Sequence, residues 1–395
     1  MFYNLPSNDP LYQANNFDWY AKRLIFDLAG NGWNYGSGWI MRRKTVDDIG
    51  GFPEDIVTED VSSSAMAMAE GWKTIYLQEG LQYGLVPETY VAYIKQMTRW
   101  HVGESQTATK FGFYHSKEKT KYMKPLQKWV QTAQGLNVHI RTPLTVLNLV
   151  FLSLAFLTDM PLVHWKDKEE MRFLLRIDCA IVLLRWLHEL HYAILAGYRS
   201  TLNETCKAIY LSPYCFMSYV RTFIIPKNLG GKPVTFTPTG SIGNQFRERD
   251  PHRRAPRWQR LRHIIADGAW FHLAVVILFL TSVFLRIGRA VSLHVLVPSG
   301  TPDWEGFWMR IIQNVAWPSN PWLVSTLACM TPLQYALFPP TTPDREKLLG
   351  KRDENGVRYP LETVRGKTKR SKLTLGYVET YTLYMIFVLA MFFVV

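Results

Sequence analysis

The chain divides into a polar first third and a remainder that carries long uncharged runs. A helix needs about 20 mainly apolar residues to cross a bilayer. Five segments approach this length, and we predict that they cross the membrane: residues 142–158, 173–197, 268–285, 320–338 and 375–395. The pattern therefore predicts an α-helical transmembrane region over residues 141–395, preceded by a globular part over residues 1–140.

Residues 205–225 are an apolar segment that fits a different location. They hold thirteen uncharged residues before Arg221, with aromatic side chains and serines interspersed. If this segment lies flat as an interfacial amphipathic helix, both of the strongly basic segments fall on the side of the globular part. Basic loops stay on the inner side of a membrane, so this arrangement obeys the positive-inside rule. We therefore predict five spans, one interfacial helix and a cytoplasmic globular part.

The formal net charge of +13 comes almost entirely from two segments. Residues 227–262 hold nine Lys and Arg against two Asp and Glu, and residues 344–372 hold ten against five. Both segments adjoin apolar runs, which is typical of membrane-protein loops and argues against nucleic acid as a partner. The four cysteines show no C-x-x-C spacing, so the sequence predicts neither a disulfide framework nor a zinc site.

Residues 1–140 carry the mixed signals of an α/β domain. A glycine-rich turn ends at Gly38, and we expect a strand over residues 39–43 and one or two short strands within residues 72–87. A helix is predicted to follow Thr58 and to stop at Gly71. Another is predicted over residues 88–108.

Two groups in this part could carry chemistry. Asp60 lies in the first turn of a predicted helix, where the helix dipole favours an ionised carboxylate that can accept a proton. Gln96 and Arg99 share one helix face beside Trp100, so they could hold a diphosphate while the indole stacks on a sugar. An acidic helix start and an amphipathic surface helix explain the same residues without a function.

The combination of these motifs is more informative than each alone. The chain resembles processive family 2 glycosyltransferases over about residues 1–285, and among them cellulose synthase and the cellulose-synthase-like enzymes of fungi. The resemblance rests on the following segments: Gly36 to Arg43, Ile49 to Phe52, Val57-Thr58-Glu59-Asp60, Gly71-Trp72, Gly84 to Glu88, and Gln96-Met97-Thr98-Arg99-Trp100.

The resemblance implies a role for each matched position. Asp60 would be the base that deprotonates the acceptor hydroxyl, within the Thr58-Glu59-Asp60 motif that faces the substrate. Gln96 and Arg99 would contact the nucleotide diphosphate, and Trp100 would stack on the acceptor sugar. The turn beside the acceptor maps to Tyr35, Gly36 and Ser37, with Tyr35 where the family has Cys. Residues 226–262 resemble the family's gating loop, with Phe236 and Thr239 matching its motif and its Lys missing.

One family motif is not found. The family uses a D-x-D to hold the Mg²⁺ or Mn²⁺ that bridges the diphosphate, but Asp9, Asp18 and Asp27 are isolated. We identify no metal ligands in this chain and expect the metal only in the complete enzyme. Residues 1–140 are therefore predicted to be the C-terminal half of a GT-A-like domain, unable to transfer sugar without a partner chain that supplies the other half. A misplaced gene start, a non-catalytic remnant and one half of a split enzyme are equally open.

The resemblance implies a multi-pass membrane enzyme that extends a polysaccharide and passes it across a membrane, which in this family is the plasma membrane. Chitin and hyaluronan synthases usually have Arg after the acidic motif, whereas Val61 follows Asp60 here. UDP-glucose is therefore the expected donor. A non-catalytic scaffold partner of such a synthase is the alternative, and a transporter is the weakest interpretation because it leaves both motifs unexplained.

Overall fold

The computed structural model describes most of the chain. The described residues are 2–6, 9–15, 17–79, 81–158, 160–161, 163–195, 203–238, 242–297, 300–316, 319–342 and 344–366. The predicted span 375–395 lies outside them.

Helices dominate the described residues. The polar first third contains η1 (Asp18–Lys22), α1 (Arg23–Leu28), α2 (Arg43–Asp48), α3 (Glu59–Ala69), α4 (Tyr90–Lys110) and η2 (Gly112–Tyr114). The apolar remainder contains α5 (Pro125–Leu136), η3 (Asn137–Arg141), α6 (Thr142–Leu157), α7 (Lys168–Leu195), α8 (Asn203–Phe223), η4 (Lys227–Leu229), α9 (Arg257–Ile264), η6 (Ile265–Ala269), α10 (Trp270–His294), α11 (Trp304–Ile311), η7 (Ile312–Ala316) and α12 (Ser319–Leu337). The described chain closes with α13 (Arg345–Leu348), β1 (Leu349–Arg352), β2 (Arg358–Pro360) and α14 (Glu362–Gly366).

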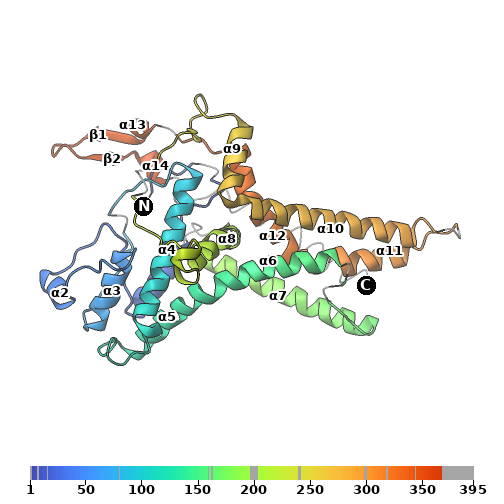
Figure 1. Ribbon diagram of the computed structural model, residues 1–395, viewed down its shortest axis with the longest axis horizontal. Coiled ribbons are helices and arrows are strands. Elements are labelled where there is room, and N and C mark those ends of the chain that lie inside the picture. The colour runs from blue at the N-terminus through green and yellow to red at the C-terminus, as the bar shows by residue number, and fades with distance from the viewer. Residues whose placement is uncertain are drawn as a thin grey trace.

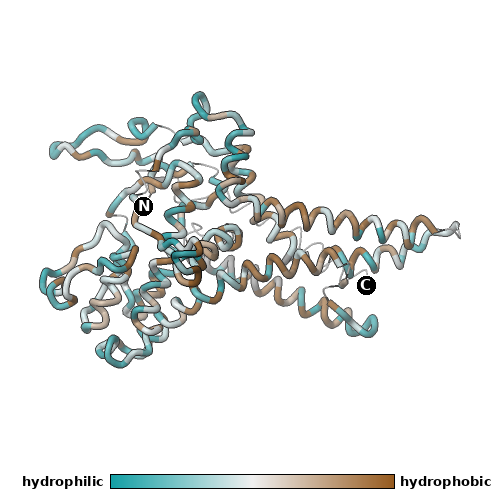
Figure 2. Tube along the Cα trace, in the orientation of Figure 1, coloured by the Kyte–Doolittle hydropathy of each residue, from teal (hydrophilic) through white to brown (hydrophobic). Residues whose placement is uncertain are grey.

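The molecule has a broad head and a helical arm. Figure 1 shows α6, α7, α10 and α11 projecting to one side, while α2, α3 and the β1–β2 hairpin lie at the opposite end. Figure 2 shows hydrophobic residues along the arm, on α6 and α10 in particular. A small core of α6, α10 and α12 holds the arm together through Leu149, Phe156, Val275, Val276, Phe279 and Cys329.

Within the described residues, two helices are long and apolar enough to cross a membrane. One runs over Pro125–Leu157 and the other over Arg257–His294, so they contain the predicted spans 142–158 and 268–285 almost completely. The predicted spans 173–197 and 320–338 fall on α7 and α12, which do not meet the same criterion over their described residues. Their membrane placement, and hence a full transmembrane bundle, stays a prediction.

Helix α8 occupies the predicted interfacial segment and connects the head to the arm. It packs against α4, α6 and α12. Helix α8 contributes Tyr210, Leu211, Tyr214 and Cys215 to the largest hydrophobic core. In this core they lie with Tyr90, Tyr93 and Met97 of α4. One face of α8 is therefore buried in protein, and its location at a membrane interface stays a prediction.

The strands expected over 39–43 and 72–87 are not formed. Within the described residues before 349, the single strand-like pairing is an isolated parallel bridge between Phe2 and Gly84. A strand needs hydrogen bonds to a neighbouring strand, whereas Tyr76 N donates to the Asp27 side chain at 2.7 Å. In this segment the side chains of Ile75 and Leu77 are exposed. The described residues of segment 1–140 therefore do not form the sheet that the α/β prediction requires.

The sheet that does form was not predicted. Strands β1 and β2 pair antiparallel within the basic segment 344–372. The turn between them contains Asn355-Gly356, with Gly356 at φ +75°, and Asp353 Oδ1 accepts from Asn355 N and Val357 N at 3.0 and 2.8 Å. An Asn-Gly pair between two short segments is a strong hairpin signal. The hairpin could therefore have been predicted from the sequence, but this segment was interpreted only by its charge.

The end of α6 is closed by a buried arginine from α10. The Arg286 guanidinium donates to Phe156 O at 2.8 Å, Ala155 O at 2.9 Å, Met160 O at 3.1 Å and Asn314 O at 2.6 Å. The last carbonyls of a helix lack partners within the helix, so one positive side chain satisfies several of them at once.

Replacing Arg286 by Leu should therefore destabilise the arm. The variant leaves buried carbonyl oxygens without donors, and we expect a loss of about 3 kcal/mol or more in the free energy of unfolding. Thermal unfolding in detergent measures this loss. Arg289→Leu, an exposed position on the same helix, is the matched control and should change the melting temperature little. Equal effects of the two variants would contradict this role of Arg286.

Candidate active site

Asp60 lies at the start of α3 beside the glycine-rich turn. Its Oδ1 accepts from Val61 N at 2.8 Å. A Cβ atom on Gly36 would lie 3.0 Å from Asp60 Oδ2, and Gly36 has φ +83°. Glycine at this position thus allows the turn to approach while leaving the carboxylate oxygen uncovered.

Ser64 joins this turn to α3. Its hydroxyl donates to the Asp60 carbonyl at 3.0 Å and accepts from Asn34 N at 2.7 Å. The Asn34 side chain in turn accepts from Gly36 N at 2.9 Å. This chain of three hydrogen bonds fixes Gly36 relative to the first turn of α3.

Burial dominates the electrostatics of Asp60. Removal from water raises the pKa of this carboxyl above its ordinary value, and the neighbouring charge of Glu59 adds to the rise. The hydrogen bond from Val61 and the positive charge of Arg99 act in the opposite direction. A carboxylate with a raised pKa is a stronger proton acceptor once it is ionised, as a general base requires.

Helix α4 holds the chain segment that leads into Asp60. Four residues on one face, spaced by four, three and four positions, contact segment 55–58. Arg99 Nη1 donates to Val57 O at 3.4 Å, and Gln106 Oε1 accepts from Val57 N at 3.1 Å. Lys110 Nζ binds the Asp55 carboxylate at 2.9 and 3.1 Å. We call Arg99, Gly103, Gln106 and Lys110 the α4 stripe.

Helix α4 and segment 55–58 approach each other most tightly at Gly103. A Cβ atom there would lie 2.2 Å from Oγ1 and 2.4 Å from Cγ2 of Thr58. Thr58 is at the N-cap position of α3 as expected, but its hydroxyl makes no capping bond and has no hydrogen-bond partner among the described residues. The buried Thr58 side chain therefore packs the α3 start onto α4, which corrects the expected capping role.

Segment 232–238, which comes much later in the chain, contacts the same face of α4. The Phe236 ring lies against Arg99, with 4.8 Å between Cζ and the ring centroid, although the side chain remains 58% exposed. Farther along, Glu248 Oε2 accepts from Tyr90 N at 2.8 Å and from the Tyr335 hydroxyl at 2.9 Å. The predicted gating loop is thus tied to the N-terminus of α4 and rests on Arg99.

The structure brings Gly36, Asp60, Arg99 and Phe236 together, whereas other predicted site residues lie apart or at the edge. The Tyr35 ring packs on the Arg23 guanidinium at 4.5 Å and on Trp19 at 5.1 Å. Trp100 is half-buried against the core of α4, α8 and α12. Their predicted contacts with substrate stay predictions.

The other predicted site residues differ in their exposure. Gln96 is half-buried one helical turn before Arg99, and Ser37 and Glu59 are exposed. Thr239 lies outside the described residues. No group of three or more His, Cys, Asp or Glu side chains suited to a metal ion occurs in the described part of the chain. The described residues therefore do not fit a metal site.

Asn34, Ser64, Gly103 and Gln106 are supporting residues that motif reasoning missed. Their signal was weak but present, since Ser64 follows Asp60 by four residues and Gly103 and Gln106 follow Arg99 by four and seven. These are the spacings at which helical residues share a face.

Comparison with known proteins gives matches to part of the chain. Residues 19–199 match the family model described as glycosyl transferase family group 2. Over 71 residues the chain is 41% identical to "Cellulose synthase 1 catalytic subunit [UDP-forming]" of Komagataeibacter xylinus, which covers 18% of this chain and 10% of that protein. Residues 19–199 are therefore similar to family 2 glycosyltransferases, and a shorter stretch is similar to cellulose synthases.

Two further relatives of the same organism give the same result. "Putative cellulose synthase 2" and "Putative cellulose synthase 3" are each 42% identical over 71 residues, or 18% of this chain and 5% of each relative. The matched stretch spans a tenth or less of the length of these relatives. The family match includes α6 and α7, and the domain boundary at residue 140 stays a prediction.

Replacing Gly103 by Ala should force α4 away from Thr58. A methyl group has no room there, and overpacking of this kind costs about 1–3 kcal/mol. Gly288→Ala is the matched control, because this helical glycine of α10 has no atom within 4 Å of the added Cβ. It should raise stability by about 0.5–1 kcal/mol. Melting temperatures that move in the same direction for both variants would show that the Gly103 contact is not tight.

Replacing Arg99 by Gln should shift the titration of Asp60. The positive charge of Arg99 lowers the pKa of that carboxyl, so its removal raises the pKa further. The carboxyl of Asp60 should therefore become protonated at a higher pH in the variant. Carbon-13 NMR of labelled aspartate in a pH titration measures this shift, with Arg43→Gln on exposed α2 as control. A titration of Asp60 that is unmoved or shifted to lower pH would contradict the coupling.

Proposed function

We propose that this chain forms the acceptor side of a membrane-bound, processive β-glycosyltransferase of the cellulose-synthase-like, fungal type, and corresponds to the C-terminal part of that enzyme. The observation that carries the proposal is the meeting of Gly36, Asp60, Arg99 and Phe236. These residues come from four segments that are distant in sequence, and each matches a motif of the family.

The geometry supports an inverting transfer. Asp60 takes the proton from an acceptor hydroxyl placed beside Gly36, and that oxygen attacks the anomeric carbon of the donor sugar. The bond from this carbon to the diphosphate oxygen breaks, and the diphosphate leaves with the bonding electrons. Arg99 lies close enough to Asp60 to influence its pKa and offers its guanidinium to the departing anion. Phe236 covers that guanidinium from the loop side.

Substrates and location follow from the family and from the apolar helices. UDP-glucose is the proposed donor and a growing β-glucan the acceptor, with Gln96 and Trp100 completing the diphosphate and sugar contacts. We place the protein in the plasma membrane as a multi-pass protein with its head in the cytoplasm. The D-x-D half of the nucleotide site, with its Mg²⁺ or Mn²⁺, would come from sequence outside these 395 residues, in the same or a partner chain.

The alternative is a non-catalytic scaffold that kept the acceptor side of such an enzyme. The contacts of Arg99 and Gln106 with the Val57 backbone fit this alternative, because they serve the structure without any chemistry. Under the scaffold alternative, Asp60 has no chemical role and its replacement leaves sugar transfer unchanged.

The test replaces Asp60 by Asn in native membranes in place of the wild-type chain. Loss of the base should lower UDP release from UDP-glucose by about 100-fold or more, because general-base catalysis contributes about 10²–10⁴-fold. The matched control is Glu54→Gln, an exposed acid in the preceding loop, which should leave the rate within about threefold. A rate for Asp60→Asn equal to that of the control would refute the catalytic proposal and favour the scaffold.

A further inference from the structure

A polar cavity beside the β1–β2 hairpin is lined by residues that the proposed sugar transfer does not use. It has a volume of about 560 Å³ and lies between the first residues of the chain, residues 81–83 and the β1–β2 hairpin. Its charged lining consists of Arg345, Arg352, Arg358 and Glu346. Three positive charges thus face one negative charge.

Arg358 and Glu346 neutralise each other. The Arg358 guanidinium is bound to the Glu346 carboxylate and also donates to Gly350 O at 2.9 Å. This pairing holds the pKa of Glu346 below its usual range, so the carboxylate stays ionised beside Arg358. The pair forms the floor of the cavity and stabilises the hairpin.

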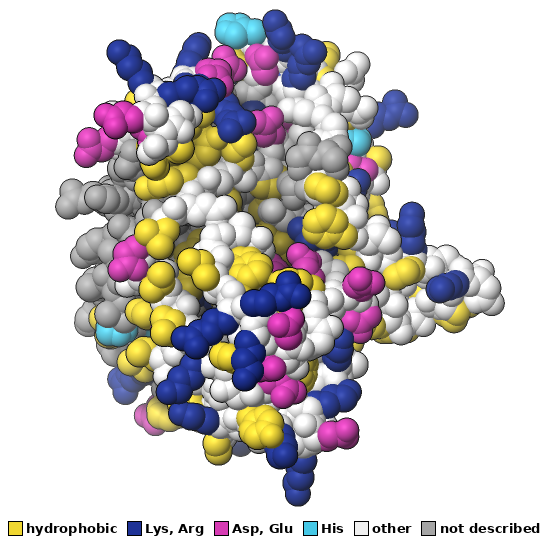
Figure 3. Space-filling model, turned by 90° about the vertical axis from the view of Figure 1, so that its left-hand side faces the viewer, with side chains coloured by type: hydrophobic (Ala, Val, Ile, Leu, Met, Phe, Trp, Pro, Cys, Tyr) yellow, Lys and Arg dark blue, Asp and Glu magenta, His cyan; other side chains and the backbone are white. Residues whose placement is uncertain are grey.

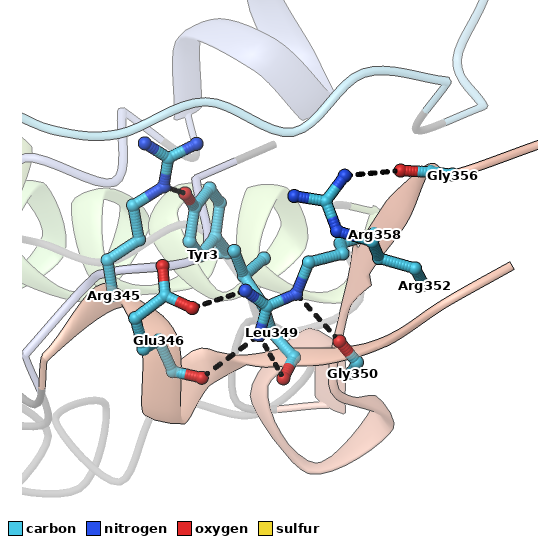
Figure 4. A network of polar contacts seen from close by, with 8 residues as sticks. All are labelled: Tyr3, Arg345, Glu346, Leu349, Gly350, Arg352, Gly356 and Arg358. Carbon is cyan, nitrogen blue, oxygen red and sulfur yellow. Dashed lines mark hydrogen bonds and ion pairs between the residues drawn. The ribbon is translucent and has the colours of Figure 1, made fainter.

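The other two arginines keep donors available. Arg345 uses Nε to donate to the Tyr3 hydroxyl at 3.1 Å, and its two terminal nitrogens have no acceptor among the described residues. Arg352 donates one terminal N–H to Gly356 O at 3.1 Å. Figure 4 shows these two guanidinium groups on either side of the Tyr3 ring, with Arg358 below. The bond to Tyr3 orients Arg345 before any ligand arrives.

The face around the cavity carries charges of both signs. Figure 3 shows Lys and Arg side chains at the top of this face with Asp and Glu side chains between them, where Figure 1 places the hairpin and the loop before α9. The excess of positive charge lies in the cavity lining itself, where three arginines face one glutamate. Uncompensated guanidinium groups select phosphate or carboxylate, because their N–H groups match two acceptor oxygens at once. Two guanidinium groups around one cavity favour the more highly charged anion.

We propose that this cavity binds a phosphate-bearing anion, held between Arg345 and Arg352. The phosphate belongs either to a small soluble molecule or to the headgroup of an anionic lipid, and both offer the same oxygens to the arginines. Binding would connect the N-terminal segment, residues 81–83 and the hairpin through one ligand. The proposal does not depend on the transferase proposal, since its test measures binding and not sugar transfer.

The experiment measures binding to the full chain in uncharged detergent by calorimetry. One arm uses pyrophosphate, and the other uses short-chain phosphatidic acid with short-chain phosphatidylcholine as its neutral counterpart. Arg345→Gln and Arg352→Gln should each weaken binding by about tenfold, because each removes a charge-assisted contact. Arg345→Lys keeps the charge but loses the planar fork, and should show an intermediate loss. Lys347→Gln removes one charge from α13 outside the cavity lining and should have little effect.

The outcomes separate the two sources. Arginine-dependent binding of pyrophosphate indicates a soluble phosphate, and arginine-dependent binding of phosphatidic acid alone indicates a lipid headgroup. Unfolding curves of each variant must match the wild type, so that a lost hairpin is not mistaken for a lost contact. Failure of both probes to bind, or binding that the two glutamine variants leave unchanged, overturns the proposal.

Discussion

The contact between α4 and segment 55–58 is the constraint on which the candidate site depends. The backbone of Val57 is held at both its N–H and its carbonyl by side chains of one helix face. Thr58 fills the space that Gly103 leaves open, so its position is set by shape as well as by hydrogen bonds. Asp60 follows two residues later, and the position of its carboxylate is therefore fixed by α4 rather than by a strand.

The same helix connects the site to the arm. On the α4 stripe it carries Arg99, while its other side packs Tyr93 and Met97 into the core shared with α8 and α12. Glu248, within the predicted gating loop, accepts a hydrogen bond from Tyr90 N in the first turn of α4. The predicted gating loop and α8 therefore both contact α4, the helix that carries the proposed diphosphate contacts Gln96 and Arg99.

The main helices of this protein could be predicted from the sequence, whereas the strands expected in residues 1–140 were wrong and the β1–β2 hairpin was overlooked despite its Asn-Gly turn. Helical periodicity is local, so α3 was expected from Thr58 to Gly71, α4 over residues 88–108, and the apolar spans on α6 and α10. Strand pairing depends on distant partners, which is why 72–87 looked like strands yet pairs only at Gly84. The candidate site shows the same division. Sequence motifs pointed to Asp60 and Arg99. The packing of Thr58 against Gly103 and the hydrogen bond from Asn34 N to Ser64 are visible only in the structure.

The most direct test of the account is a cryo-electron microscopy structure of the chain with a cello-oligosaccharide in detergent. The terminal acceptor hydroxyl should lie within hydrogen-bond distance of the Asp60 carboxylate, about 2.6–3.2 Å, with the terminal sugar beside Gly36. The α4 stripe should keep its contacts with segment 55–58. An oligosaccharide bound elsewhere, with Asp60 covered or directed away from it, would contradict the central claim that this carboxylate is the acceptor base.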